Sequence, residues 1–209
     1  MASSTKTADT EPSAPEIAPI PAPIVVTPRC IIRRYHISDI PRVAHHANNP
    51  NVARYLRPHF PSPYSLADAE AWYQFACTGD RPLSYINKHS AICDPKTNTF
   101  MGSIGIRPLG ADETRTVELG YWLGEEFWGC GIVPEAAREF SRWVFENFTE
   151  EEVQRLEASV YGVNLRSQRV LRKAEFVYEG TRRRAGFKHG EAFDILMFGL
   201  VREDLKKEG

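Results

Sequence analysis

Two glycines, Gly129 and Gly131, stand in a short turn between a strand-like run and a helix-like run. Residues 116–123 have the composition of a strand, and after the turn apolar residues recur at helical spacing. Pro134 fits the first turn of that helix, where the missing N–H of proline is not needed. A glycine turn at a helix N-terminus leaves backbone N–H groups free, at the positive end of the helix dipole. The sequence therefore predicts a phosphate-bearing ligand at residues 129–134.

The glycine spacing restricts the kind of phosphate ligand. It is neither the Gly-x-Gly-x-x-Gly of dinucleotide sites nor the Gly-Lys-Ser/Thr of P-loops. The stretch Trp128-Gly129-Cys130-Gly131-Ile132-Val133 resembles the acetyl-CoA-binding motif Gln/Arg-x-x-Gly-x-Gly/Ala of the GNAT N-acetyltransferase superfamily. Its Trp-Gly-x-Gly form, followed by Glu135 and Ala136, is similar to the RimJ/RimL branch. Two departures, Val133 in place of a small residue and Pro134 without an N–H, are expected to weaken or reshape pyrophosphate binding.

A second segment, residues 164–173, carries the same resemblance. It reads Asn-Leu-Arg-Ser-Gln-Arg-Val-Leu-Arg-Lys and is similar to a segment that follows the fifth strand in RimJ/RimL proteins. The resemblance covers about residues 30–203 and implies acetyl-CoA as co-substrate, with no metal. The cofactor-binding residues that it implies are Leu119, Gly120, Tyr121, Trp128, Gly129, Cys130, Gly131, Ile132, Val133, Asn164 and Ser167.

Composition and charge narrow the class of protein. The chain has 209 residues, 42% of them hydrophobic, and a net charge of −1. These values fit one globular domain, and the balanced charge gives no reason to expect nucleic acid or a membrane as a partner. No apolar run approaches the roughly 20 residues that span a bilayer. The four cysteines form no Cys-x-x-Cys pair, which argues against a zinc site and for reduced thiols in a cytoplasmic protein.

The chain is expected to divide into a tail and a domain. Residues 1–28 are rich in Pro, Ala, Ser and Thr, so they cannot bury enough apolar surface to offset the entropy of ordering. We expect a disordered tail at 1–28 and an acetyltransferase domain at 29–209. In the domain, hairpins precede a strand–helix–strand crossover, which favours an α/β (mixed α+β) fold with a mixed sheet. The resemblance implies the GNAT fold, whose mostly antiparallel sheet has helices on both faces.

The expected strands cover residues 30–35, 84–93, 99–107, 113–123, 153–161, 176–184 and 191–200, and the expected helices begin near residues 38, 65, 134 and 164. Residues 51–64 are expected to form a loop, because three prolines interrupt them. The family resemblance implies that this loop and the helix after it wall the site of the acetyl acceptor.

Glu118 is the first candidate for a catalytic residue. It stands in the middle of an expected strand, where glutamate is disfavoured, and Gly120 beyond it indicates a bulge or a close ligand approach. Acetylation of an amine requires removal of a proton from the ammonium, and a partly desolvated carboxylate can take that proton directly or through water. The alternative is a glutamate on the solvent face of the strand. The resemblance adds a backbone N–H at Gly120–Tyr121 that stabilises the oxyanion.

Ser167 is the second catalytic candidate, and it rests on the resemblance, which places this serine near the sulfur of CoA as a proton donor to the leaving thiolate. Asn164 would contact the pantetheine or the helix start, and the alternative is a plain helix cap. Many family members use a tyrosine one turn later as general acid, but Leu171 occupies that position here. The proton then comes from Ser167, a water or Tyr161, or no general acid is needed.

The implied reaction is direct attack of a primary amine on acetyl-CoA in a ternary complex. The acceptor is a small-molecule amine or the N-terminal α-amine of a protein, and the protein is a monomer or a homodimer. A rival interpretation is a degenerate fold that binds CoA, or nothing, and serves as an interaction module. The departures at Val133, Pro134, Leu171 and Glu175 keep that rival open. A covalent route through Cys130 is disfavoured, because the sequence suggests no base near it.

Overall fold

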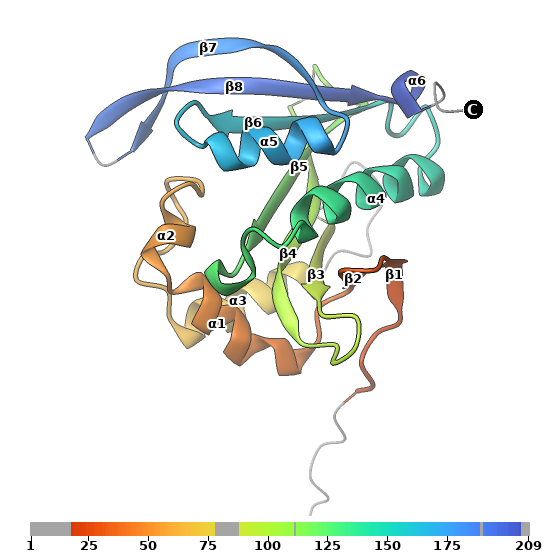
Figure 1. Ribbon diagram of the computed structural model, residues 1–209, viewed down its shortest axis with the longest axis vertical. Coiled ribbons are helices and arrows are strands. Elements are labelled where there is room, and N and C mark those ends of the chain that lie inside the picture. Colours follow the sequence, from red (N-terminus) through yellow and green to blue (C-terminus); the bar gives the residue numbers. More distant parts are fainter. Residues whose placement is uncertain (1–17, 78–87, 111, 189, 206–209) are drawn as a thin grey trace, which may run out of the picture.

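An eight-stranded sheet runs through the protein (Figure 1). The computed structural model describes residues 18–77, 88–110, 112–188 and 190–205. Within these ranges the strand order is β1-β2-β3-β4-β5-β6-β8-β7. The strands are β1 (Pro23–Val26), β2 (Ile31–Arg33), β3 (Lys88–Cys93), β4 (Phe100–Pro108), β5 (Thr116–Leu123), β6 (Arg155–Tyr161), β7 (Val177–Lys188) and β8 (Glu191–Val201).

Neighbouring strands are antiparallel except β5 and β6, which run parallel. Strand β5 pairs with β4 from Val117 to Leu123, but it pairs with β6 only over residues 116–118. Beyond Glu118 the two strands separate, and β5 and β6 run in clearly different directions in Figure 1. The sheet is therefore mixed and mostly antiparallel, which confirms the predicted fold class.

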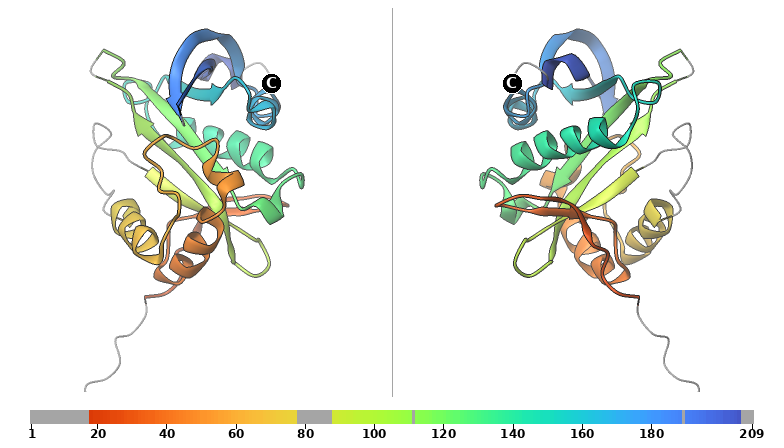
Figure 2. Two further views of the ribbon diagram at one scale, coloured as in Figure 1. Left: turned by 90° about the vertical axis from the view of Figure 1, so that its left-hand side faces the viewer. Right: turned by 90° about the vertical axis from the view of Figure 1, so that its right-hand side faces the viewer.

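Helices cover both faces of the sheet (Figures 1 and 2). Helices α4 (Ile132–Asn147) and α5 (Leu165–Lys173) lie on one face, and α1 (Ile40–Ala47) and α3 (Leu66–Cys77) lie on the other. The shorter helices are η1 (Ile37–Asp39), α2 (Pro50–Ala53), η3 (Glu125–Phe127) and α6 (Arg202–Leu205). In the described part of the chain, every helix is too short or too polar to cross a membrane.

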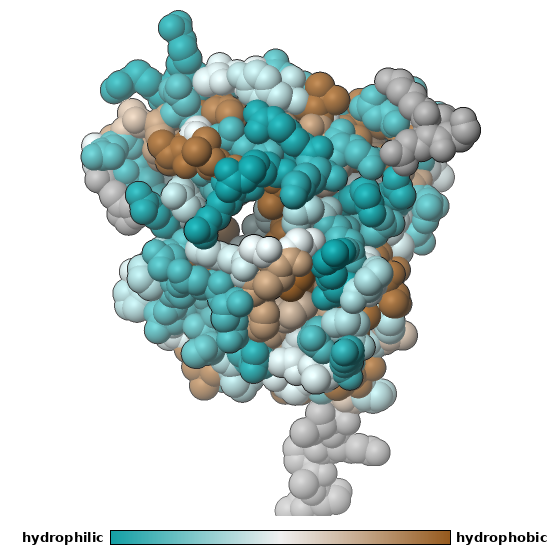
Figure 3. All heavy atoms as spheres, in the orientation of Figure 1, coloured by the Kyte–Doolittle hydropathy of each residue, from teal (hydrophilic) through white to brown (hydrophobic). Residues whose placement is uncertain are grey.

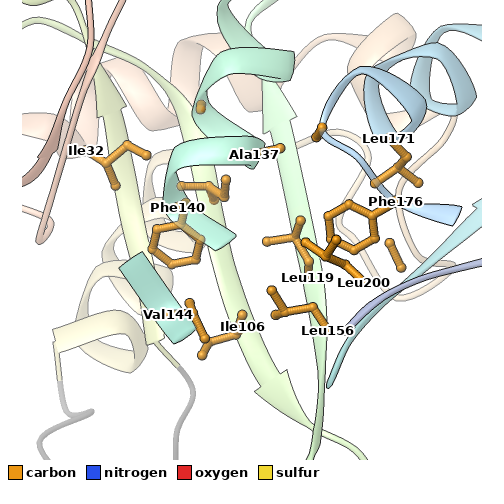
Figure 4. Packing of buried hydrophobic residues seen from close by; sticks show 14 of the residues in the cluster. Ile32, Ile106, Leu119, Ala137, Phe140, Val144, Leu156, Leu171, Phe176 and Leu200 are labelled. Carbon is orange, nitrogen blue, oxygen red and sulfur yellow. The ribbon is translucent and has the colours of Figure 1, made fainter. Parts of the chain in front are cut away.

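The larger hydrophobic cluster fills the space between α4, α5 and the sheet (Figure 4). Helix α4 forms here because its apolar residues recur every three to four positions, which aligns them on one face. Phe140 and Val144 of that face are fully buried and lie near Ile106 of β4. Burial of such a side chain stabilises the fold by about 1.5–3 kcal/mol. The packing fixes the orientation of α4 and with it the position of the glycine turn.

A second cluster lies on the opposite face, beneath α1 and α3. Alternate side chains of β5 reach the two clusters, since successive strand residues point to opposite faces. Leu119 and Leu123 belong to the first cluster, whereas Trp122 packs against the second. Glu118 and Gly120 therefore share the face of Trp122.

A buried ion pair joins β2 to the start of α1. The Arg33 side chain is 1% exposed, and its Nη1 and Nη2 donate to the two carboxylate oxygens of Asp39 at 2.8 and 2.9 Å. Arg33 Nε also donates to Asn98 Oδ1 at 2.7 Å. Burial of two charges is tolerated because each has a partner of opposite sign and further hydrogen bonds. The pair holds the helical layer against the sheet.

Three stretches differ from the sequence-based expectation. Strand β1 lies inside the range 1–28 that composition predicts as a disordered tail; it pairs with β2, and Val25 is buried. A main-chain partner therefore orders this stretch despite its composition. Helix α2 lies at the predicted loop, and Asn49 caps it by accepting from the N–H of Asn51. The predicted strand at 84–93 is described from Lys88 onward, and residues 1–17 and 84–87 lie outside the described residues.

Candidate functional site

The glycine turn has the backbone that only glycine adopts readily. Gly129 and Gly131 have φ angles of 82° and 76°, in the left-handed region where a Cβ would be strained. Gly131 is the N-cap of α4, and as a glycine it has no side chain that could accept a hydrogen bond from the first N–H groups of the helix. The first N–H groups of α4 therefore have no cap, as the sequence predicts for an anion site.

The two departures from the family motif leave this turn intact. The helix begins at Ile132, and Pro134 lies in its first turn. The side chain of Val133 is partly buried and packs against the larger hydrophobic cluster. Val133 therefore contributes to the packing of α4 against the core.

Sequence analysis missed Arg29, which lies beside the turn. Its backbone N–H donates to Glu135 Oε1 at 3.1 Å, and its guanidinium forms an ion pair with the same carboxylate. Arg29 Nε lies 3.4 Å from the position that a Cβ would take at Gly131. Burial opposes the ionisation of Glu135, but hydrogen bonds from Thr27 and Arg29 outweigh it and lower the pKa of Glu135. The ion pair of Arg29 and Glu135 therefore lies beside the glycine turn, through a contact that spans 106 residues.

Trp128 connects the turn to both β5 and α5. Its indole Nε1 donates to the carbonyl of Leu123 at 2.8 Å, at the end of β5. The guanidinium carbon of Arg166, in the first turn of α5, lies 5.0 Å from the centre of the Trp128 ring system. Cys130 is exposed, and its Sγ lies 3.7 Å from the carbonyl of Trp128. The predicted residues 128–133 therefore adjoin the N-terminus of α5.

Glu118 is buried at the point where β5 and β6 separate. It is 6% exposed, so the alternative of a solvent-face glutamate is wrong. Arg57 Nη2 donates to its Oε1 at 2.6 Å, Ser159 Oγ donates to the same oxygen at 2.8 Å, and Arg107 forms an ion pair with Oε2. Sequence analysis missed these three partners, which come from the loop after α2 and from strands β6 and β4.

Gly120 lies opposite Gly105 in the pairing of β5 with β4. The register of this pair shows no shift, so the bulge expected at Gly120 is wrong. The pairing with β6 instead ends at Glu118. Beyond that residue, the backbone N–H and C=O groups of β5 that point away from β4 have no partner on β6 and are available to a ligand. A Cβ added at Gly120 would meet nothing within 4 Å. Gly120 therefore leaves open space on the face that carries Glu118.

His89 flanks this glycine pair. It pairs with Gly105 from the β3 side, and its ring centroid lies 4.6 Å from that of Trp72 on α3. Burial lowers the pKa of His89 to about 4, and the nearby charge of Arg107 adds to the effect. The imidazole is therefore neutral at pH 7.

The segment around α2 is attached to the far end of the sheet. Lys188 Nζ, at the end of β7, donates to the carbonyls of Ala53 and Leu56 at 2.8 and 2.7 Å. Tyr161 donates from its hydroxyl to the carbonyl of Leu56 at 3.0 Å. These bonds place Arg57 over Glu118. Figure 3 shows the surface hollowed between the parts of the molecule that carry α5 and α2.

Ser167 meets Tyr121 across the gap between α5 and β5. The two hydroxyl oxygens lie 2.8 Å apart. Asn164 Oδ1 accepts from the N–H of Ser167 at 3.1 Å, which confirms that Asn164 caps α5. Burial raises the pKa of Tyr121, and the hydrogen bond with Ser167 opposes this rise in part. Leu171, where many family members carry a tyrosine, is fully buried.

The predicted site residues thus gather around one place, the separation of β5 and β6. Glu118 and Gly120 lie on the face of the sheet that α1 and α3 cover, Tyr121 contacts Ser167, and the glycine turn adjoins α5 through Trp128. Among the described residues, no group of three or more His, Cys, Asp and Glu side chains could hold a metal ion.

This combination of fold and site is that of an acyltransferase. A sequence profile of the acetyltransferase (GNAT) domain family matches residues 29–177. The uncharacterized N-acetyltransferase p20 of Bacillus licheniformis is 25% identical over 178 residues, which cover 85% of this chain and 96% of that protein. The chain belongs to the GNAT acetyltransferase family, which confirms the family and the enzyme class expected from the sequence.

Solved structures share the fold. The microcin C7 self-immunity acetyltransferase MccE, solved with acetyl-CoA and AMP, matches with a TM-score of 0.72 at 15% identity, over 88% of this chain and 98% of that one. RimL, the ribosomal L7/L12 α-N-protein acetyltransferase solved with coenzyme A, matches with a TM-score of 0.71 at 19% identity, over 86% of this chain and 98% of that one.

Proposed function

We propose that this protein transfers an acetyl group from acetyl-CoA to a primary amine, by direct attack in a ternary complex. One observation carries the proposal: β5 and β6 separate between an uncapped glycine turn and a buried glutamate. Separated parallel strands offer unpaired backbone groups to a ligand that lies between them. The turn binds phosphate at one end of this gap, and Glu118 meets the acceptor amine at the other.

The residues at the turn fit a pyrophosphate. Backbone N–H groups of residues 129–133 donate to its oxygens, and the exposed guanidinium of Arg29, which pairs with Glu135, offers further N–H donors beside Gly131. Val133 packs against the larger hydrophobic cluster. Pro134 removes one backbone N–H donor, but it lies in the first turn, where a proline does not distort the helix. When bound, acetyl-CoA supplies an acetyl group activated as a thioester.

Glu118 accepts the proton of the acceptor ammonium, directly or through a water. In this structure the carboxylate of Glu118 forms ion pairs with two guanidinium groups and accepts a hydrogen bond from the hydroxyl of Ser159. The base therefore acts only after the acceptor has displaced one of them. Arg57 is suited to leave, because its side chain is 48% exposed and it extends from a loop rather than from the sheet.

Backbone N–H groups of β5 near Gly120 and Tyr121 stabilise the oxyanion that forms during attack. Ser167, held by the Asn164 cap and in contact with Tyr121, donates a proton to the departing thiolate. Tyr161 has its hydroxyl engaged with the carbonyl of Leu56, so Ser167 is the better placed of the two.

The acceptor is a small-molecule amine or the N-terminal α-amine of a protein. The similarity to RimL, whose name describes an α-N-protein acetyltransferase, supports the second. Incubation of the protein with acetyl-CoA and a mixture of small amines and peptides tests the proposal, with CoA release and acetylated products measured by mass spectrometry. Acetylation of any amine supports it. CoA binding without transfer to any amine contradicts it and favours the interaction module.

A further inference from the structure

Two arginines from distant parts of the chain converge on one carboxylate. Arg57, in the loop between α2 and α3, donates through Nη2 to both oxygens of Glu118. Arg107, on β4 directly opposite Glu118 in the pairing, forms an ion pair with Oε2 through its own Nη2. The arrangement joins the acceptor side of the sheet to the loop that covers it.

Both arginines keep hydrogen-bonding capacity for a ligand. Their side chains are 48% and 41% exposed, whereas that of Glu118 is 8% exposed. A guanidinium carries five N–H donors, and among the described residues Glu118 is the hydrogen-bond or ion-pair partner found for Arg57 and Arg107. The contacts with Glu118 use the Nη2 atoms, so each half-exposed guanidinium has further N–H donors for a ligand.

The charges around Glu118 do not cancel. One carboxylate meets two guanidinium groups, which leaves one positive charge in excess. Lys188 adds another ammonium near the same loop, bound to the carbonyls of Ala53 and Leu56. Glu157, beside Glu118 on β6, pairs with Arg155, which also pairs with Glu179, so this neighbouring cluster carries one negative charge in excess. At its base, an acceptor ammonium therefore meets two guanidinium groups, and a negative charge on the acceptor itself would pair with them.

From these contacts we infer that the acceptor carries a carboxylate close to its reactive amine, and that Arg57 and Arg107 bind this carboxylate. The inference rests on the proposed acetyl transfer. The acceptor carboxylate replaces Glu118 as the partner of Arg57, which frees Glu118 to receive the proton of the amine. The open space over Gly120 receives the atoms between the two groups. The same chemistry occurs in a free amino acid and in a peptide whose second residue is acidic.

Matched acceptors test the inference. Free amino acids are compared with their α-amides, and C-terminally amidated peptides that begin Ser-Glu are compared with those that begin Ser-Gln. We expect kcat/KM to be at least about tenfold higher for the acid than for the amide in one of the two series, since a charge-assisted pair to arginine is lost in the amide. The series that shows the preference identifies the source of the carboxylate.

Variants locate the preference. Arg107→Gln and Arg57→Gln are expected to bring the acid-to-amide ratio close to one. Arg138→Gln, which changes an arginine of equal exposure that pairs with Glu139 on α4, is the control and leaves the ratio unchanged. The ratio cancels any general loss of rate from disturbance of Glu118.

The outcomes separate this inference from the proposed function. Equal use of acids and amides, or an unchanged ratio in both arginine variants, overturns the inference and leaves acetyl transfer in place. Acetyl-CoA binding, measured by calorimetry, with no acetylation of any acid also overturns it. Failure to bind acetyl-CoA overturns the proposed function, and the inference with it.

Discussion

The hydroxyl of Tyr121 on β5 lies 2.8 Å from Ser167 Oγ on α5. The contact spans the gap between β5, which carries Glu118, and α5, whose first turn adjoins Trp128 of the glycine turn. It supplies a phenol near the place where Leu171 replaces the tyrosine used by many family members. Burial raises the pKa of Tyr121, so the phenol stays protonated and keeps the serine in one orientation.

Replacement of Ser167 by alanine is expected to lower kcat about 10- to 100-fold, because a proton donor to the thiolate is lost. The KM for acetyl-CoA should change little. Steady-state kinetics measure both constants, and Tyr121→Phe should reproduce part of the loss. A matched control is Asn164→Ala, which removes the cap of α5 and should cost about 1 kcal/mol of stability. If Ser167→Ala lowers the melting temperature as Asn164→Ala does but leaves kcat intact, its role is structural.

Replacement of Glu118 by glutamine should lower the rate of transfer about 100-fold or more while leaving the affinity for acetyl-CoA nearly unchanged. Glutamine keeps the size of the side chain but cannot take the proton. Turnover is measured at saturating acceptor, and affinity is measured by calorimetry. Full turnover at saturating acceptor would show that Glu118 is not the base.

Replacement of Gly131 by alanine should weaken acetyl-CoA binding at least about tenfold. A Cβ at φ 76° costs about 1–2 kcal/mol in the left-handed region, and it would lie 3.4 Å from Arg29 Nε. The turn relieves this strain by moving its N–H groups. Gly110→Ala is the control, since a Cβ there meets nothing within 4 Å. Equal affinity of both variants, measured by calorimetry, would separate the turn from the ligand.

Stability should fall below neutral pH in a way that depends on His89. Its pKa is about 4 in the folded protein against an ordinary 6.5, so the unfolded chain takes up a proton at a higher pH than the folded one. The resulting stability is complete above about pH 6.5 and is lost as the pH falls to about 4, a change of about 3 kcal/mol. Urea unfolding at pH 7.5 and 4.5 measures it. His89→Gln should lose less stability over this range, and an equal loss in both proteins would contradict the burial of a neutral histidine.

Local signals made much of the fold and half of the site predictable. The glycine turn, the helix after it and the Asn164 cap each depend on residues within a few positions of one another, so their pattern is visible in the sequence. The order of strands and helices then fixes the sheet, since parallel strands require a crossover. Strand β1 was hidden because its order comes from the partner strand β2 rather than from its own composition.

The ion pairs of the site could not be predicted from local sequence patterns. Arg29 reaches Glu135 over 106 residues, and Arg57 reaches Glu118 over 61. A single arginine produces no periodic pattern in the sequence. Taken alone, each of these arginines would be expected on the surface, with no indication of its distant partner. The bulge expected at Gly120 failed for a related reason: a glycine in a strand signals free space, but the sequence does not say whether a bulge or a separating neighbour strand supplies it.

Binding of acetyl-CoA tests the central claim most directly. Thermal unfolding is followed with acetyl-CoA, free CoA or ATP, each at the same concentration. A ligand at about 100 times its Kd stabilises the folded state by roughly 2.7 kcal/mol, which corresponds to a rise of about 5–10 °C for a chain of this size. The account predicts that rise with acetyl-CoA and CoA but not with ATP. No shift with either CoA species would contradict it and would mean that the turn before α4 does not hold a phosphate ligand.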